Sequence, residues 1–347
     1  MIEGIFVEGL IYSMMVLGVF ITFRILDFPD LTVDGSFPLG AAVMAIMISN
    51  GANLALALVL SFAAGVVAGM VTATIHNKLH VPNLLAGILT MTMLYSINIR
   101  VLGNRPNLPL LRERTILTMF TERLGFIPEE WSLLIFFIAV SLVFKVMLDL
   151  FFKTDLGLTL GAMGNNQQMV VTQGVNPEVL KLVGVGLSNG LVAISGAFVA
   201  QYQGFADVNL GQGIIIAGLA SVMIGEFILR SNRIGLLTLR VILGSIAFRG
   251  IMYLGRYYGY YINLTPNDLK LITGILIIVS LVVTQLRKQR RATSVDLDLD
   301  HNPNQPIPSN SPGVPSSETD PAPGLPAAGR GSTPDAPAGP SRTGGRR

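Results

Sequence analysis

Runs of apolar residues, each broken by only a few polar positions, recur along the first 286 residues of the chain. A helix needs about 20 mostly apolar residues to cross a bilayer. The shortest run, at residues 35–48, contains Pro38, and we expect a broken or central helix there, lining a cavity where irregular backbone is tolerated. The pattern predicts about nine helical segments, at residues 5–23, 35–48, 52–75, 83–102, 131–152, 178–200, 212–229, 234–254 and 268–286.

Composition supports a membrane protein. The chain is 51% hydrophobic and 13% charged, whereas soluble domains carry about 25% charged residues. Stretches without a solvated face are stable in a bilayer, so the fold class we predict is all-α and polytopic, with a transmembrane domain at residues 1–286. The chain has no cysteine, which excludes disulfides and thiolate chemistry.

The C-terminal segment has a different character. Residues 287–347 hold 11 of the 19 prolines and no Phe, Trp or Tyr. Such a stretch cannot bury enough apolar surface to offset the entropy of ordering it. We therefore expect a disordered, cytoplasmic tail rich in Pro, Gly and Ser.

Basic residues in short loops predict the orientation, because they favour the cytoplasmic side. Arg287 to Arg291 follow the last apolar run directly, so the C-terminus is expected in the cytoplasm. An odd number of spans then places the acidic N-terminus, with Glu3 and Glu8, outside. The loop at residues 103–130 does not fit this rule, because it holds several arginines and yet this orientation places it outside. This basic cluster at a membrane boundary also explains the positive net charge, so the charge does not indicate a nucleic-acid partner.

Two stretches of the chain resemble each other. Residues 30–43 and 206–222 each have polar Asp or Asn and Gly positions followed by an apolar helix. Internal repeats are common in transporter folds, where such polar segments face the pathway. Coincidence is the alternative explanation.

The connection at residues 153–177 is longer than the usual 4–6 residues or so between elements. It contains a short helix-compatible run at residues 166–172, then Gly174, and then Pro177 at a first helical turn. We predict a structured element on the cytoplasmic side. The alternative is an incidental long loop.

Two regions of the chain carry recognisable motifs. One is the stretch Leu26–Ala42, with Asp34-Gly35 in its middle. The other holds Gly161, Ala162, Gly164, Asn165, Asn166, Gly174, Val175 and Asn176, followed by Ser195-Gly196-Ala197. These motifs resemble the permeases of the branched-chain amino acid and ribose type of ABC importer, which have the type II importer fold. The resemblance covers about residues 5–286 and is nearest to the branch that includes aromatic amino acid importers. The first region is similar to that family's first-to-second helix junction, where His-Gly is common in place of Asp34-Gly35, and the second matches its cytoplasmic loop pattern.

This resemblance implies a channel-forming subunit in a bacterial inner membrane that moves a small solute, an amino acid or a related compound. Its partners would be a cytoplasmic ATP-binding subunit, a periplasmic or lipid-anchored solute-binding protein, a second permease copy and membrane lipid. The chain contains no GxxxxGK[ST] motif, so ATP hydrolysis is expected in the separate subunit, and no enzymatic activity, cofactor or metal is expected here. The residues implied in coupling to the ATPase are Gly164, Asn165, Asn166, Gln167, Gln168, Gln173 and Gly174.

Polar residues within the spans are the candidates for the translocation pathway, because such residues are costly in a membrane and usually functional. Asp34 and Ser36 lie at the start of the short second segment, and Ser188 and Asn189 lie in the middle of the sixth. Hydrogen bonding between helices is the alternative role for Ser188 and Asn189. A stand-alone transporter driven by an ion gradient is the alternative function, with Asp34 and Glu226 as proton or cation sites.

Overall fold

The computed structural model describes residues 2–259, apart from 112, 124, 126, 127 and 230–233, together with the single positions 274 and 278. Apart from those two positions, the predicted helix at 268–286 lies outside the described residues, as do the basic cluster after it and the tail at 287–347.

The described residues are almost entirely helical. The first helix, α1 (Ile2–Phe20), continues into a π-helical turn, η1 (Ile21–Ile25). The only strands in the described part are β1 (Asn107–Pro109) and β2 (Phe205–Asp207). The other helices are α2 (Val33–Ser49), α3 (Leu54–Leu79), α4 (Asn83–Val101), α5 (Ile116–Arg123), α6 (Glu129–Lys153), α7 (Asp155–Asn165), α8 (Gln167–Thr172), α9 (Pro177–Gln203), α10 (Ile214–Ile228) and α11 (Ile234–Gly259).

Six helical stretches in the described part are long and apolar enough to cross a membrane, and α2 and α10 are shorter apolar helices. Each of the eight predicted segments within the described residues coincides with one of these helices, so the all-α, polytopic prediction is confirmed. The second segment is a central helix, as expected, but it is continuous through Pro38 rather than broken. The six long stretches are Glu3–Ile25, Leu54–Leu79, Asn83–Val101, Glu130–Lys153, Pro177–Gln203 and Gly235–Gly255.

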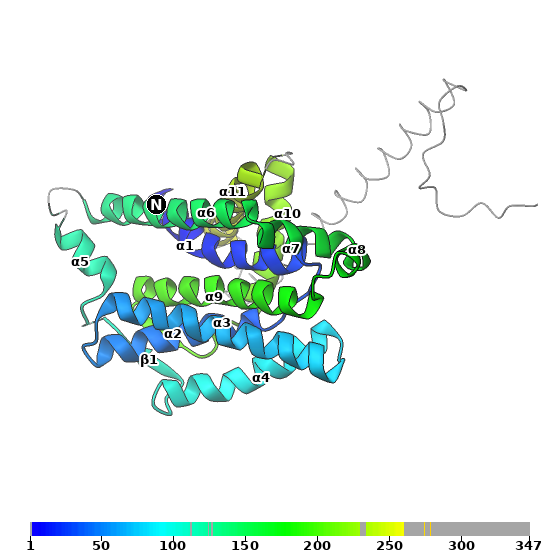
Figure 1. Cartoon of the computed structure of the whole chain (residues 1–347). Coiled ribbons are helices and arrows are strands. Elements are labelled where there is room, and N and C mark those ends of the chain that lie inside the picture. The colour runs from blue at the N-terminus through cyan, green and yellow to red at the C-terminus, as the bar shows by residue number, and fades with distance from the viewer. Residues whose placement is uncertain are drawn as a thin grey trace, which may run out of the picture. The chain divides into compact units, whose positions relative to one another are not determined.

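Helix α9 forms the centre of the bundle. It packs against α1, α2 and α3, and Figure 1 shows it between α1 and α6 on one side and α2, α3 and α4 on the other. Most of its apolar stretch, 83%, is buried within the protein. Helix α6 lies at the periphery, with only 17% of its stretch buried. The same length and apolar character therefore serve both a core helix and a peripheral one.

Small residues let α3 approach α9 closely. A side chain at Gly65 would overlap the carbonyl of Asn189, and one at Gly69 would overlap the carbonyl of Val185. Close backbone contact of this kind holds membrane helices together where no hydrophobic drive acts between them. It explains why Gly65 and Gly69 repeat at four-residue spacing on α3.

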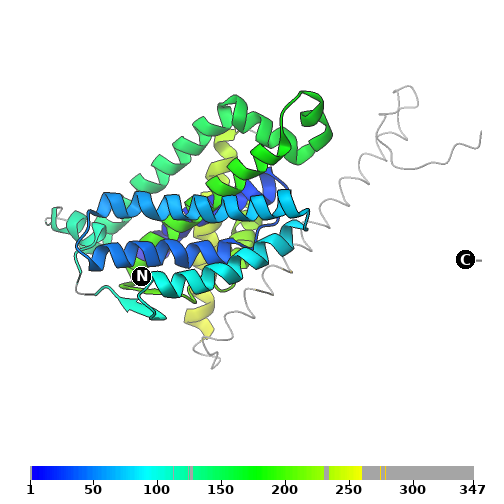
Figure 2. The same ribbon diagram turned by 60° about the horizontal axis from the view of Figure 1, so that its bottom comes forward.

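The bundle has two distinct ends. The α7–α8 turn lies at one end, and α5 lies at the opposite end (Figures 1 and 2). At the α5 end, β1 pairs with β2 in an antiparallel ladder in which Leu108 lies opposite Ala206. This ladder joins the chain that leaves α4 to the chain that leaves α9.

Candidate functional site

The predicted structured element at residues 153–177 is a pair of short helices. Thr154 caps α7 through the amide of Gly157, and Asn166 caps α8 by accepting a hydrogen bond of 3.1 Å from the amide of Met169. The predicted short helix at 166–172 is confirmed as α8. Helix α7 was not predicted, because its sequence DLGLTLGAMGN contains three glycines that lower helix propensity.

Most of the predicted coupling residues lie on the exposed tip of this element. Asn165, Asn166, Gln167, Gln168 and Gln173 are all exposed. Because hydrogen bonds cap α8 at both its ends, these amides are held on a short helix at the end of the bundle.

The two glycines in the predicted set have backbone roles. Gly174 ends α8 with a φ of +79°, a conformation that favours glycine. Gly164 packs against the carbonyl of Ile25 and leaves no room there for a side chain. Gly164 therefore lets α7 pack closely against η1, the turn that continues α1.

Three apolar residues of α8 were missed by the sequence analysis. Val170 is fully buried and anchors α8 to the bundle, whereas Met169 and Val171 on either side of it are half-exposed, at 51% and 50%. Apolar side chains on an otherwise polar tip are typical of a surface that a partner covers. The sequence carried no signal for this, since a six-residue helix is too short to show which face is buried.

A polar cluster lies buried between α2, α3 and α9. Ser36 donates a hydrogen bond of 2.6 Å to Asn189 Oδ1, and Asn189 Nδ2 donates one of 2.7 Å to Asp30. The other oxygen of Asp30 accepts from the amide of Thr32 at 2.9 Å, and the Thr32 hydroxyl contacts that of Thr72 at 2.6 Å. The structure thus brings two predicted pathway residues, Ser36 and Asn189, into one network.

Asp30 is the site residue that sequence reasoning missed. It is 2% exposed, and it lies two residues before Thr32, the N-cap of α2. An Asp just ahead of a helix start was the available signal, because carboxylates are favoured near helix N-termini.

Ser188 faces away from this network. Its hydroxyl donates to the carbonyl of Gly18 on α1, at 2.7 Å. Ser36, Ser188 and Asn189 are each fully buried within the chain, where they join helices by hydrogen bonds. Their predicted contact with a solute stays a prediction.

Asp34 connects α2 to α10. Its carboxylate accepts hydrogen bonds from the amides of Gly213, at 3.0 Å, and Ile215, at 2.9 Å, which are free donors at the start of α10. Pro38 has no N–H to donate to the carbonyl of Asp34, and the backbone at Gly211 packs against that carbonyl. The two polar segments that resemble each other in sequence therefore meet in space.

Glu226 is held between two arginines. Its carboxylate lies 2.9 Å from Arg24 on η1 and 3.1 Å from Arg240 on α11. A second ionic contact joins Lys145 and Asp149 on α6, and Asp149 also accepts from the hydroxyl of Thr238 on α11. Both acidic residues of the ion-driven alternative, Asp34 and Glu226, thus have structural partners.

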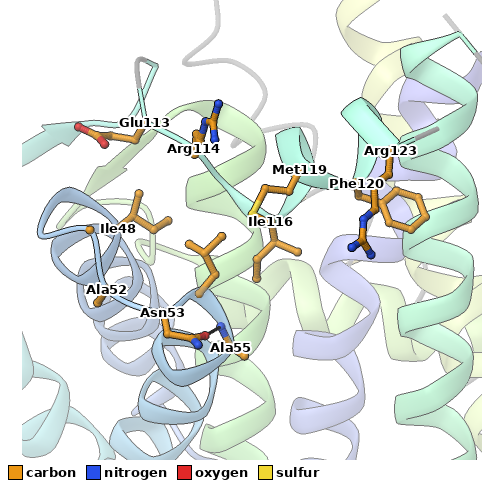
Figure 3. A pocket seen from close by; sticks show the side chains of 12 residues that line it. Ile48, Ala52, Asn53, Ala55, Glu113, Arg114, Ile116, Met119, Phe120 and Arg123 are labelled. Carbon is orange, nitrogen blue, oxygen red and sulfur yellow. Dashed lines mark hydrogen bonds between the residues drawn. The ribbon is translucent and has the colours of Figure 1, made fainter. Parts of the chain in front are cut away.

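A cavity of about 820 Å³ opens at the α5 end of the bundle. Figure 3 shows Ile48, from the end of α2, and Ala52 and Asn53, from the turn after it, on one side of the cavity, with Ile116, Met119 and Phe120 of α5 on the other. Charged side chains lie with them, namely Glu113, Arg114 and Arg123. The cavity is thus apolar in its walls and charged at its rim.

The family model described as the permease component of the branched-chain amino acid transport system matches residues 1–281. The chain belongs to this family. It is a permease component of an import system, and the resemblance seen in its motifs is confirmed.

The chain is 38% identical over 296 residues to the tyrosine transport system permease protein of Clostridioides difficile, covering 85% of this chain and 95% of that protein. It is 34% identical over 276 residues to an uncharacterized protein of Rickettsia prowazekii, covering 79% and 94% of the two chains. It is 24% identical over 198 residues to an autoinducer 2 import system permease protein of Salmonella typhimurium, covering 56% and 54%. No solved structure matches the chain.

Proposed function

We propose that this permease transports an aromatic amino acid or a related compound, and that its α7–α8 element couples the bundle to a cytoplasmic ATPase. The tyrosine permease of Clostridioides difficile suggests the solute class. The permease family implies ATPase and binding-protein partners.

One observation carries the coupling role. The α7–α8 tip presents exposed amides beside half-exposed Met169 and Val171, while Val170 and Gly164 fix the same element to the bundle. A partner that moves the tip would therefore move η1 and α1 with it. Nucleotide-driven closure needs a short, rigid connection of this kind to rearrange helices.

The remaining partners follow from the two ends of the bundle. With the tip in the cytoplasm, the α5 end faces outward, where the cavity of Figure 3 would receive solute from a binding protein. A second copy of the chain would complete the pathway as a homodimer. The N-terminus then lies outside and the C-terminus inside.

Co-purification of the ATPase tests the coupling role. Q168R places a bulky charge on the exposed tip, and we expect it to reduce both the ATPase retained by the tagged permease and ATP-driven uptake in proteoliposomes. E122R is the matched control, because Glu122 is equally an exposed residue of a short helix but lies on α5 at the other end. ATPase retention should be unchanged in E122R.

Two results would oppose the proposal. Normal retention and uptake in Q168R would remove the coupling role from α8. Uptake by the wild-type complex that continues without ATP and stops with an uncoupler would favour a transporter driven by an ion gradient.

A further inference from the structure

A crevice of about 200 Å³, with both polar and apolar walls, lies where two helices begin inside the bundle. The first turn of α2 and the loop before α10 form two of its walls, and the middle of α4 forms the third. The crevice exists because α10 begins beside Asp34, inside the bundle, and not at the end of the bundle. The chain between β2 and α10 must therefore run alongside α4 to reach that point. The lining residues are Asp34, Gly35, Pro38, Met91, Thr92, Tyr95, Asn98, Val208 and Gln212.

One polar side-chain atom of the crevice is buried and has no partner among the described residues, and that atom is an acceptor. Asn98 is fully buried; its Nδ2 donates to the carbonyl of Gly35 at 3.1 Å, while its Oδ1 finds no partner among the described residues. Thr92 donates its hydroxyl proton to the carbonyl of Ile88, and Gln212 donates from its amide to Asn209. A buried acceptor without a partner is unusual in a folded protein and points to a missing donor.

The charge that lines the crevice also favours a donor over an acceptor. The carboxylate of Asp34 is the only charged side chain among the lining residues. Its oxygens accept amide hydrogen bonds from the start of α10, and a carboxylate has about four lone-pair sites, so it can accept a further donor. A cationic donor would therefore be attracted to this crevice, and an anion would be repelled.

The rest of the lining is apolar or aromatic. Met91, Pro38 and Val208 form apolar walls, and Tyr95 is 48% exposed at the opening. Sites that enclose a whole ligand have volumes of about 300–1,000 Å³. A crevice of about 200 Å³ holds one end of a solute and leaves its remainder on the open face of α4.

We propose that this crevice binds the ammonium group of the transported solute, with Asn98 Oδ1 and the Asp34 carboxylate as acceptors and Tyr95 beside the solute's apolar body. The solute class is then a primary amine with an aromatic or apolar side chain, and carboxylic acids without the amine are excluded. The proposal rests on the proposed function, since it identifies the crevice as part of the pathway.

Protection of an engineered thiol tests the proposal in the full complex with its ATPase and binding protein. The chain has no cysteine, so T92C places a single thiol in the crevice. The control I97C places its thiol at Ile97, which precedes Asn98 in sequence, is 45% exposed and does not line the crevice. We expect tyramine at about ten times its dissociation constant to slow labelling of T92C roughly tenfold. The acid 3-(4-hydroxyphenyl)propionate, which lacks the amine, should not slow it, and I97C should label equally fast in all conditions.

A second variant confirms the acceptor. N98L removes the buried Oδ1 and should abolish protection of T92C by tyramine, provided that the double variant elutes as the same folded complex. Equal protection by the amine and the acid, or none by the amine, would overturn the proposal. Failure of the proposed function would give a different result. The wild-type complex would then show no ATP-driven uptake of an aromatic amino acid, whether or not tyramine protects T92C.

Discussion

Helices α4 and α6 are both exposed in this chain, yet they differ in character. Only 28% of the apolar stretch of α4 and 17% of that of α6 are buried, but their mean hydropathies are 1.5 and 2.5. The open face of α6 carries residues such as Leu142, Val143 and Leu150. The open face of α4 also has apolar residues, but Tyr95, Ser96 and Arg100 lie between them.

This difference shows that exposure in a single chain does not define the surroundings of a membrane helix. Lipid accepts only apolar side chains at low cost, so the face of α6 suits lipid. Polar positions on an open helix face suit a water-filled pathway or a second protein chain. The side of α4 that bears the crevice is therefore the side on which we expect the pathway.

Introduction of a charge should give the largest contrast between the two helices. Val143 is 64% exposed near the middle of α6, and Thr92 is exposed at the middle of α4. A charge at the centre of a lipid-facing helix costs about 2.5–3.5 kcal/mol. V143R should therefore lower the yield of folded, membrane-inserted protein several-fold, measured by fluorescence-detected size exclusion, while T92R stays near wild type. Equal losses in both variants would mean that α4 also faces lipid.

Removal of an ionic contact should have the next largest effect. Asp149 is the acidic partner of Lys145 and also accepts from Thr238, so it fastens α6 to α11 on its protein side. D149L leaves Lys145 without its partner in a poorly solvated place, which we expect to cost about 2–3 kcal/mol of unfolding free energy.

Thermal unfolding in detergent measures this loss. R100L on the open face of α4 is the control, and a change within about 0.5 kcal/mol is expected there. The double variant K145M/D149L should recover part of the loss. No destabilisation in D149L would show that α6 is held by apolar packing alone.

Thiol labelling should give the smallest but most direct contrast. Single cysteines at Ser96 on α4 and Leu142 on α6 are both exposed in the chain, which has no cysteine of its own. A thiol in hydrocarbon forms little thiolate, so a charged, water-soluble reagent should label S96C at least about tenfold faster than L142C. Similar rates in intact proteoliposomes would contradict the assignment of the two faces.

Much of the candidate site could be predicted from residue type and position. The exposed amides of α8 and the cap formed by Asn166 follow from local hydrogen-bonding preferences, which act within a few residues. The pairing of Ser36 with Asn189 could not be predicted, because 153 residues separate them and neither sequence position indicates which helix face the other occupies. The contact of Asp30 with Asn189 could not be predicted for the same reason, although the place of Asp30 just before a helix start gave a local signal.

The sequence by itself determined that this chain forms apolar helices, because a backbone in a bilayer must satisfy its own hydrogen bonds and the side chains around it must be apolar. Only the tertiary structure decided that α9 is the core and α6 the periphery, because lipid and protein interior are alike to an apolar side chain. It also decided that Asp34 caps α10. That contact depends on α10 beginning inside the bundle, where its free amides need an acceptor that only a folded neighbour provides.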